Sequence, residues 1–343
     1  VSSAGSEQYI DAGGGVIRKD YAPRDGATVL KFASAAEFLT SNKLVDTIVV
    51  AADDLAIAEI PEALKITASD DFSGSTTTGG RNDGQEGLLI KTSSTVTAAS
   101  TVVLGALASD YIQGIDLSAG TTGNSSISAA ADTQSKALRL VGGKGKNTIT
   151  GGKGADAIVG NSADDVLTGG DGADRITTGD GRDTVKGGKG NDTIVMGKKF
   201  DGFDSIDGGA DTDTLQFIDN GSGTDDLDKI ENIEAVELGN ADANITLKTG
   251  VVAAGKSLSI SFETATTTNK LTLDANDALG TVSVTGAKGA DIITGGDAAD
   301  TITGGEGADV LNGDSGADAF AYKTSSDGTD TIGDFAQGTD LIA

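Results

Sequence analysis

The sequence predicts an all-β protein: a right-handed parallel β-roll or β-helix solenoid, with an N-terminal mainly-β region that includes a short helix. Three observations predict it. Residues 142–195 repeat a nine-residue phrase six times without a gap, and residues 286–321 repeat it four more times. The phrase is G-G-x-G-x-D-x-U-x, with U a large aliphatic residue, and repeats of this kind stack as coils. Between the blocks, short apolar runs recur at the spacing of β-strands.

The repeat keeps its phase more closely than a disordered glycine-rich linker would. Two further units, 199–207 and 208–216, follow a three-residue slip and bring the number of units to twelve. Position eight is apolar in all twelve, and position six is Asp in eleven, with Asn147 as the exception. A flexible linker has no reason to hold a hydrophobe and an acid at fixed positions. The pattern therefore indicates a folded repeat.

Each position of the repeat has a physical role. Glycine at positions one, two and four allows positive φ, so that the loop tightens with its carbonyls turned inward. The last three residues form a short strand whose middle side chain faces the core. Two nonapeptides make one coil, so position-six acids on the same edge stack about 4.8 Å apart. Carboxylates that close repel one another unless a cation lies between them, and Ca²⁺ accepts about six to eight carboxylate and carbonyl oxygens.

These units resemble those of the repeats-in-toxin (RTX) family of secreted proteins. In that family Ca²⁺ lies between loops of neighbouring coils, held by position-six side chains and by main-chain carbonyls of the first four loop positions. The resemblance implies multiple Ca²⁺ ions, on the order of ten. The side-chain ligands that it implies are Asn147, Asp156, Asp165, Asp174, Asp183, Asp192, Asp204, Asp213, Asp291, Asp300, Asp309 and Asp318. The carbonyl ligands that it implies are those of Gly151, Gly152, Lys153, Gly154, Gly169, Gly170, Asp171, Gly172, Gly187, Gly188, Lys189, Gly190, Gly295, Gly296, Asp297, Gly304, Gly305, Glu306 and Gly307.

Some units depart from the family pattern. Asn147 is neutral, Ala163 and Ala298 replace the glycine at position four, and Thr178 replaces a leading glycine. The unit that starts at residue 199 also lacks its leading glycines. We expect incomplete or weaker coordination in these turns.

The end of the chain resembles the terminal segment of type I-secreted members of the family. The pattern D-x-I-x-D-F-x-x-G-x-D-x-I runs here from Asp330 to Ile342. Asp330 and Asp340 are further candidate calcium ligands. In an equally open alternative, the aromatic and aliphatic residues of this segment simply cover the last coil.

Four regions are expected in chain order. They are a mainly-β region at 1–141, a first calcium roll at 142–216, metal-free solenoid coils at 217–285, and a second roll with a C-terminal cap and secretion segment at 286–343. A capping-box pattern at 34–37 predicts a short helix near 35–42. Residues up to 141 then alternate turns with apolar runs, which indicates all-β structure but leaves a sandwich and irregular coils both open.

Composition excludes several classes of function. The chain has 52 acidic and 25 basic residues, a net charge of −27, so nucleic acid is not an expected partner. It has no Cys and no His, which excludes thiolate and imidazole metal sites, Ser-His-Asp triads and H-E-x-x-H helices. The sequence contains no run of about eighteen consecutive apolar residues, so we expect no membrane insertion. We therefore expect no catalytic residue and no enzyme, although paired carboxylates and calcium-assisted polysaccharide cleavage remain chemically open.

The whole chain, rich in Thr, Ala and Gly and poor in aromatic residues, resembles bacterial surface-layer proteins exported by the type I route. The resemblance implies a secreted subunit that folds on extracellular calcium and assembles with itself into a two-dimensional lattice on the cell surface, with envelope polysaccharide as a candidate anchor. The alternatives are a module of an RTX adhesin or biofilm-matrix protein and the accessory roll of a secreted enzyme. The N-terminus lacks a basic region followed by an apolar run, so we expect a processed or cut end.

Overall fold

The computed structural model describes residues 112–118, 123–196, 204–217, 224–239, 241–262, 268–322 and 327–343, and the backbone of seven strands nearer the N-terminus. Every regular element in these residues is a β-strand. No helix in the described part of the chain is long and apolar enough to cross a membrane. The predicted helix near 35–42 lies outside the described residues. The chain forms two compact units, Val1–Thr178 and Gly179–Ala343.

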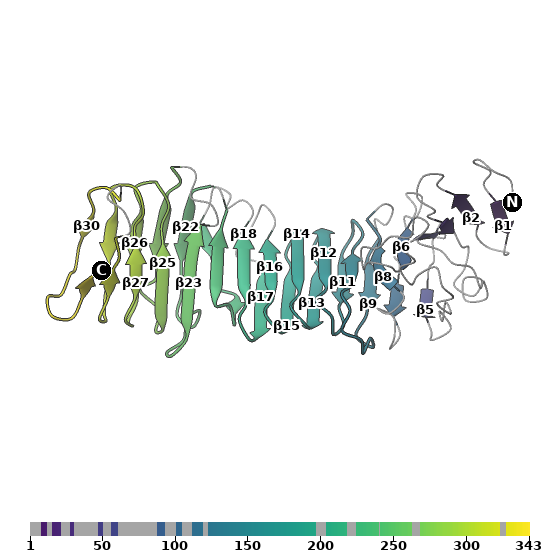
Figure 1. Ribbon diagram of the computed structural model, residues 1–343, viewed down its shortest axis with the longest axis horizontal. Coiled ribbons are helices and arrows are strands. Elements are labelled where there is room, and N and C mark those ends of the chain that lie inside the picture. The colour runs from purple at the N-terminus through teal and green to yellow at the C-terminus, as the bar shows by residue number, and fades with distance from the viewer. Residues whose placement is uncertain are drawn as a thin grey trace, which may run out of the picture. The chain divides into compact units, whose positions relative to one another are not determined.

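Parallel strands build most of the first unit (Figure 1). One ladder has the order β4-β6-β8-β10-β12-β14 and a second has the order β5-β7-β9-β11-β13. Successive nonapeptides alternate between the two ladders, so paired positions are eighteen residues apart: Leu140 pairs with Ile158, and Ile149 with Leu167. The strands are β4 (Thr47–Val50), β5 (Ala56–Ile60), β6 (Leu88–Thr92), β7 (Thr101–Leu104), β8 (Ile112–Asp116), β9 (Ser125–Ser128), β10 (Arg139–Val141), β11 (Asn147–Thr150), β12 (Ala157–Ser162), β13 (Val166–Asp171) and β14 (Arg175–Asp180).

The strands that precede the first nonapeptide belong to the same ladders. Strands β4, β6 and β8 pair in parallel with one another and lead to β10, and β5, β7 and β9 lead to β11. This pairing favours irregular solenoid coils over a sandwich for these segments. Three strands precede them: β1 (Gln8–Asp11), β2 (Val16–Tyr21) and β3 (Thr28–Leu30). Strand β2 pairs antiparallel with both β1 and β3, and β3 pairs in parallel with β4.

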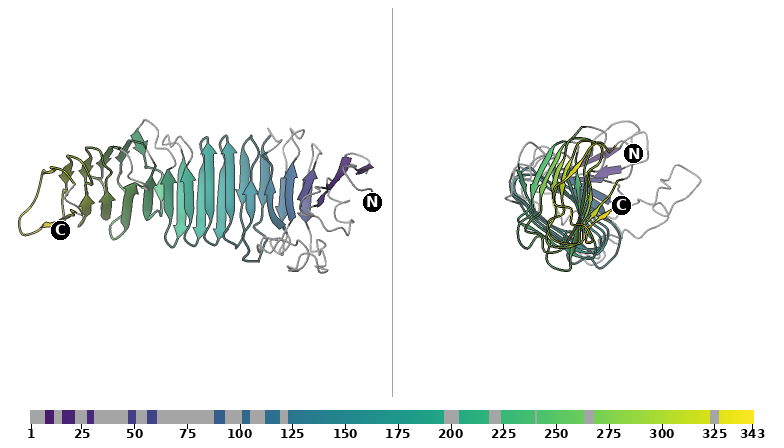
Figure 2. Two further views of the ribbon diagram at one scale, coloured as in Figure 1. Left: turned by 45° about the horizontal axis from the view of Figure 1, so that its top comes forward. Right: turned by 90° about the vertical axis from the view of Figure 1, so that its left-hand side faces the viewer.

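The second unit is also built of parallel ladders, whose strands stand side by side in Figure 2. One ladder has the order β16-β18-β21-β23-β25-β27-β29-β31, another β15-β17-β20, and a third β19-β22-β24-β26-β28-β30. The strands are β15 (Thr184–Lys189), β16 (Thr193–Met196), β17 (Ser205–Ala210), β18 (Thr214–Phe217), β19 (Thr224–Asp226), β20 (Ile230–Glu231), β21 (Ala235–Leu238), β22 (Ala243–Thr246), β23 (Ser257–Phe262), β24 (Leu271–Asp274), β25 (Thr281–Thr285), β26 (Ile292–Thr294), β27 (Thr301–Thr303), β28 (Val310–Asn312), β29 (Ala319–Phe320), β30 (Thr331–Ile332) and β31 (Leu341–Ile342).

The longest of these ladders runs through the region without glycine loops. Val236, Ile260 and Val284 continue, in register, the row that runs from Ile194 and Leu215 to Ile302. The coils of 217–285 therefore stack on those of the second block. The predicted region boundaries and the absence of metal from these coils stay predictions.

Position eight of the repeat forms the core. The side chains alternate along each short strand, so the middle residue points inward and its neighbours point outward. Ile149, Ile158, Leu167 and Ile176 are fully buried, and the equivalent residues of the second block are equally enclosed. Most strands of the repeats thus bury one aliphatic side chain, worth about 1.5–3 kcal/mol. Strands between the two blocks bury more, as β25 does with Val282 and Val284. The prediction of an all-β parallel solenoid is confirmed, and its core is narrow.

Two adjacent isoleucines on β26 test this alternation. Ile293 is 0% exposed, whereas Ile292 is 38% exposed. We expect Ile293→Ala to lower the free energy of unfolding by about 2–5 kcal/mol, because it leaves a cavity in the core row. Ile292→Ala, the matched control, is expected to cost less than about 1 kcal/mol. Denaturant unfolding in calcium measures both, and equal losses would contradict the assigned register.

Candidate metal site

The aspartates at position six of the repeats are buried. Each is at most 2% exposed, and most of them sit where a glycine loop enters a strand. Carboxylates with so little access to water need hydrogen-bond donors or a cation to remain charged. The residues are Asp156, Asp165, Asp174, Asp183, Asp192, Asp204, Asp213, Asp291, Asp300, Asp309 and Asp318.

One carboxylate oxygen of these residues joins neighbouring coils. The main-chain N–H of Asp156 donates to Oδ1 of Asp174 at 2.7 Å, and the N–H of Asp291 donates to Oδ1 of Asp309 at 2.8 Å. The same bond joins four more pairs, in which the donor and acceptor residues are Asn147 and Asp165, Asp183 and Asp204, Asp192 and Asp213, and Asp300 and Asp318. The acids are therefore arranged in columns, one carboxylate per coil along each edge.

The second oxygen faces the glycine loop of its own turn. In the Asp156, Asp291 and Asp300 turns it accepts the N–H of position two, at 2.6–2.9 Å. At Asp213 and Asp309 the buried Oδ2 has no hydrogen-bond donor among the described residues. Leaving a buried charged oxygen without a partner is costly. These atoms mark places where a positive ion would be stabilised.

Main-chain carbonyls converge on the same place. A Cβ built on Gly151 would lie 2.2 Å from the carbonyl oxygen of Gly169 in the next coil and 2.6 Å from Oδ2 of Asp156. At Gly286 the corresponding distances are 2.2 Å to the carbonyl oxygen of Gly304 and 2.3 Å to Oδ2 of Asp291. Glycine is thus required at these two positions because oxygen atoms of two coils occupy the space that a side chain would need. The loops bring carbonyl and carboxylate oxygens together.

This set of oxygens fits Ca²⁺. No three acidic side chains among the described residues lie close enough to hold an ion by themselves. Carbonyls must therefore supply most of the ligands, and Ca²⁺ accepts them readily in flexible geometry. Position-two carbonyls also accept a hydrogen bond from the next coil, as Gly152 does from the N–H of Asp171 at 3.0 Å, but a carbonyl oxygen has a second lone pair. The ligand role of each residue stays a prediction.

Burial sets the charge state of these acids in the absence of metal. It raises the pKa of Asp156, Asp213 and Asp291 to about 6, although N–H donors such as Gly152 and Leu138 lower the pKa of Asp156. Neighbouring acids raise these values further, as Glu234 does for Asp213. The carboxylates are thus held in surroundings that favour either a proton or a metal ion.

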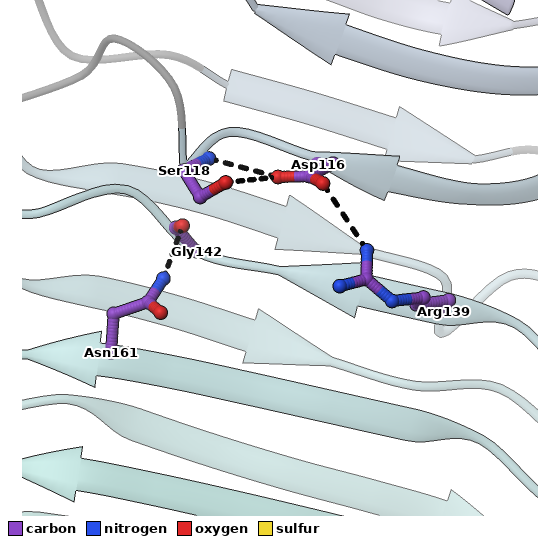
Figure 3. Close-up of polar contacts among 5 residues, drawn as sticks. All are labelled: Asp116, Ser118, Arg139, Gly142 and Asn161. Carbon is purple, nitrogen blue, oxygen red and sulfur yellow. Dashed lines mark hydrogen bonds and ion pairs between the residues drawn. The ribbon is translucent and has the colours of Figure 1, made fainter.

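Asp116, an acid outside the repeats, shows the opposite arrangement (Figure 3). Its Oδ1 accepts hydrogen bonds from the N–H and hydroxyl of Ser118, and its Oδ2 lies 3.2 Å from Nη1 of Arg139. Burial raises its pKa, but these donors and the guanidinium charge outweigh burial and hold the pKa of Asp116 below its usual value. Protein groups alone satisfy this carboxylate.

The two C-terminal candidates occupy the position-six place in the last coils. The N–H of Asp309 donates to Oδ1 of Asp330 at 2.9 Å, and the N–H of Asp318 donates to Oδ1 of Asp340 at 3.2 Å. Oδ2 of Asp340 accepts the N–H of Ala336 at 2.7 Å, which repeats the contact between position two and position six. Both residues are half-buried and extend the columns of the second block. Their role as ligands stays a prediction.

The structure adds acids that the sequence patterns did not mark. Oε2 of Glu234 accepts the N–H of Asp213 at 2.9 Å, so its side chain takes the position-six place in the coil after the first block. The loop before Glu234 lacks the glycines of the repeat, so the sequence pattern does not mark this residue as a position-six acid. Asp132 is 2% exposed in the loop before β10, and its charge raises the pKa of Asp156. It also lies outside any nonapeptide.

The comparison with family models agrees with this geometry. The model of the RTX calcium-binding nonapeptide repeat, which spans four copies, matches residues 139–167, 159–194 and 285–320. These segments carry RTX calcium-binding repeats, and together with the parallel β-solenoid they support the RTX β-roll family. The matching model describes a calcium-binding repeat and no catalytic domain. No curated protein and no solved structure matched the chain.

The raised pKa values predict how pH affects stability in chelator. The folded-state pKa of about 6 lies above the ordinary value of 3.8, so between these values the folded chain binds more protons than the unfolded chain. The stability of the chelated protein should therefore fall as pH rises from about 4 to about 6. Ca²⁺ binds the ionised form, so the stabilisation by calcium should grow over the same range. Thermal melts with and without calcium measure both trends, and a chelated protein that is more stable at neutral pH would contradict the assignment.

Proposed function

We propose that the chain is a secreted structural module whose columns of buried aspartates bind Ca²⁺ outside the cell, and that it serves as a surface-layer subunit. One observation carries the calcium-binding part. Buried carboxylates with raised pKa values stand beside converging carbonyl oxygens, and at Asp213 and Asp309 one buried oxygen has no donor among the described residues. A divalent cation supplies what these atoms lack.

Calcium accounts for the conditional stability of such a chain. Extracellular calcium modules bind with Kd values of about 0.1–1 mM. A site with a Kd of about 0.1 mM contributes about 1.4 kcal/mol in about 1 mM calcium, and this gain vanishes when free calcium is far below the Kd. With a net charge of −27, the chain repels itself where calcium is scarce. It can therefore pass through an export channel unfolded and become rigid outside the cell.

The lattice role rests on the absence of catalytic motifs in the sequence and on the acids that the columns leave exposed. Asp297, Glu306 and Asp314 lie on the outer side of the turns of the second block. Acids of this kind on two copies can share a cation, so the ion that stiffens each coil also joins neighbouring subunits. Envelope polysaccharide is the anchor that we propose for the sheet.

A pair of aspartates in one turn tests the calcium site. Asp300 is buried at position six, and Asp297 is exposed at position three. Asp300→Asn should lower the melting temperature in about 1 mM calcium by about 3–6 °C, because one site is lost, and should change it much less in chelator. Asp297→Asn, with the same loss of charge, should leave both values nearly unchanged. Equal effects of the two substitutions in calcium would contradict the ligand assignment.

The lattice is tested by electron microscopy of the full chain before and after calcium is added. We expect ordered two-dimensional sheets in calcium that disperse in chelator. Dispersed rods at every calcium concentration would contradict the lattice role and would favour an adhesin or biofilm-matrix module, while the calcium sites would stand.

A further inference from the structure

We infer that the junction between turns 142–147 and 160–165 is closed by side-chain amides in place of Ca²⁺, so that this step of the first roll is independent of calcium. The inference rests on the proposed function, since it concerns two turns on an edge of that roll. It changes the role of Asn147, which the resemblance to the RTX family places among the ligands. Its amide nitrogen takes the place of the ion.

The amide nitrogen of Asn147 lies where oxygens of two loops converge. The side chain is fully buried. Nδ2 is 2.7 Å from the carbonyl oxygen of Gly145 and 3.2 Å from that of Gly143, both in its own turn. In the next coil it is 3.0 Å from the carbonyl oxygen of Gly160 and 3.0 Å from Oδ1 of Asp165. Three carbonyls and one carboxylate thus surround one nitrogen.

The hydrogen bonds fix the orientation of this amide. The N–H of Gly143 donates to Oδ1 of Asn147 at 2.9 Å. A flipped side chain would set its NH₂ group against this donor and its oxygen against four other oxygens, which is unfavourable. The positive end of the amide dipole therefore points into the group of oxygens.

A second amide closes the junction from the opposite loop (Figure 3). Nδ2 of Asn161 donates to the carbonyl oxygen of Gly142 at 2.7 Å and lies 3.5 Å from that of Gly143. Asn161 has a φ of 85° and Ala163 a φ of 78°, in the left-handed region that costs a residue with a side chain about 1 kcal/mol or more. The loop keeps its tight form without the usual glycines, and the amide bonds help to offset that cost.

The Asp291 turn has oxygens of the same kinds, and its position-six side chain carries no N–H group. At Asp291 the position-one carbonyl of Gly304 comes from the next coil, and Oδ1 of Asp309 accepts the N–H of Asp291. An aspartate brings another acceptor where Asn147 brings two N–H groups. Replacing the amide of Asn147 by a carboxylate should therefore turn this junction into a site for one more ion.

A calcium-independent junction has a place in folding. On its own edge, the junction follows the coils that precede the repeats, since Asn147 pairs with Ser125 on one side and gives its N–H to Asp165 on the other. Because its donors belong to the chain, this junction can form before any ion binds, at the energetic cost of ordering its loops alone. The Asp156 turn lies on the other edge, and the aspartate junctions then add to one that is already formed.

The test uses the full chain and four variants, with bound Ca²⁺ counted by native mass spectrometry at saturating calcium. Asn147→Asp should bind one ion more than the unmodified chain. Thr148→Asp adds the same charge at the exposed neighbouring position, and it should bind the same number as the unmodified chain. Asn147→Ala should lose stability and no ion, and Asn161→Gly, which removes the second amide and its strained backbone, should also lose no ion.

The outcomes separate this inference from the proposed function. An unchanged count in folded Asn147→Asp, or the loss of one ion in Asn147→Ala, would overturn the inference, and the second result would mean that Asn147 is a calcium ligand. If Asn147→Ala does not fold, the comparison of Asn147→Asp with Thr148→Asp still decides. An unmodified chain that binds no calcium would overturn the proposed function itself.

Discussion

The structure depends on the hydrogen bond from the main-chain N–H at position six of one coil to the carboxylate of position six in the next. This bond, 2.6–2.8 Å long between repeat units, sets the spacing of the loops and draws an acid into the protein at most turns of the repeats. It also creates the main electrostatic cost of the fold, because like charges are stacked along each edge with little water. Ca²⁺, with carbonyls of the glycine loops as its other ligands, is the natural counter-charge.

The columns begin next to neutral groups. In the coil before the first aspartate of three columns, the equivalent position is an aliphatic residue that donates its main-chain N–H to that aspartate. The donor and acceptor pairs are Leu138 and Asp156, Leu271 and Asp291, and Val282 and Asp300. The first acid of these columns thus has no acidic neighbour at position six on that side. At its far end, the column of Asp192 and Asp213 reaches Glu234. Beyond Glu234 the parallel strands continue to stack, and aliphatic residues such as Ile260 and Val284 form the row between them.

A narrow core explains why so much depends on the loops. In most strands of the repeats, one aliphatic residue fixes which face points inward, but it gives each coil few contacts beyond its two neighbours. Stability in such repeats is therefore close to a sum of nearest-neighbour steps. Each step is then adjusted locally by its loop chemistry: aspartates at most junctions, and the amides of Asn147 and Asn161 at one.

The sequence by itself determined the parallel solenoid, the row at position eight and the acid at position six, because these features follow from local periodicity and from the freedom of glycine at positive φ. Tertiary structure decided what depends on the neighbouring coil. Glu234 and Asp132 reach the columns from loops without a motif, and the amide of Asn147 meets Gly160 and Asp165 only because a coil of eighteen residues sets those turns side by side. No pattern within one nonapeptide contains such contacts, since the oxygens around each site come from two turns that are far apart along the chain.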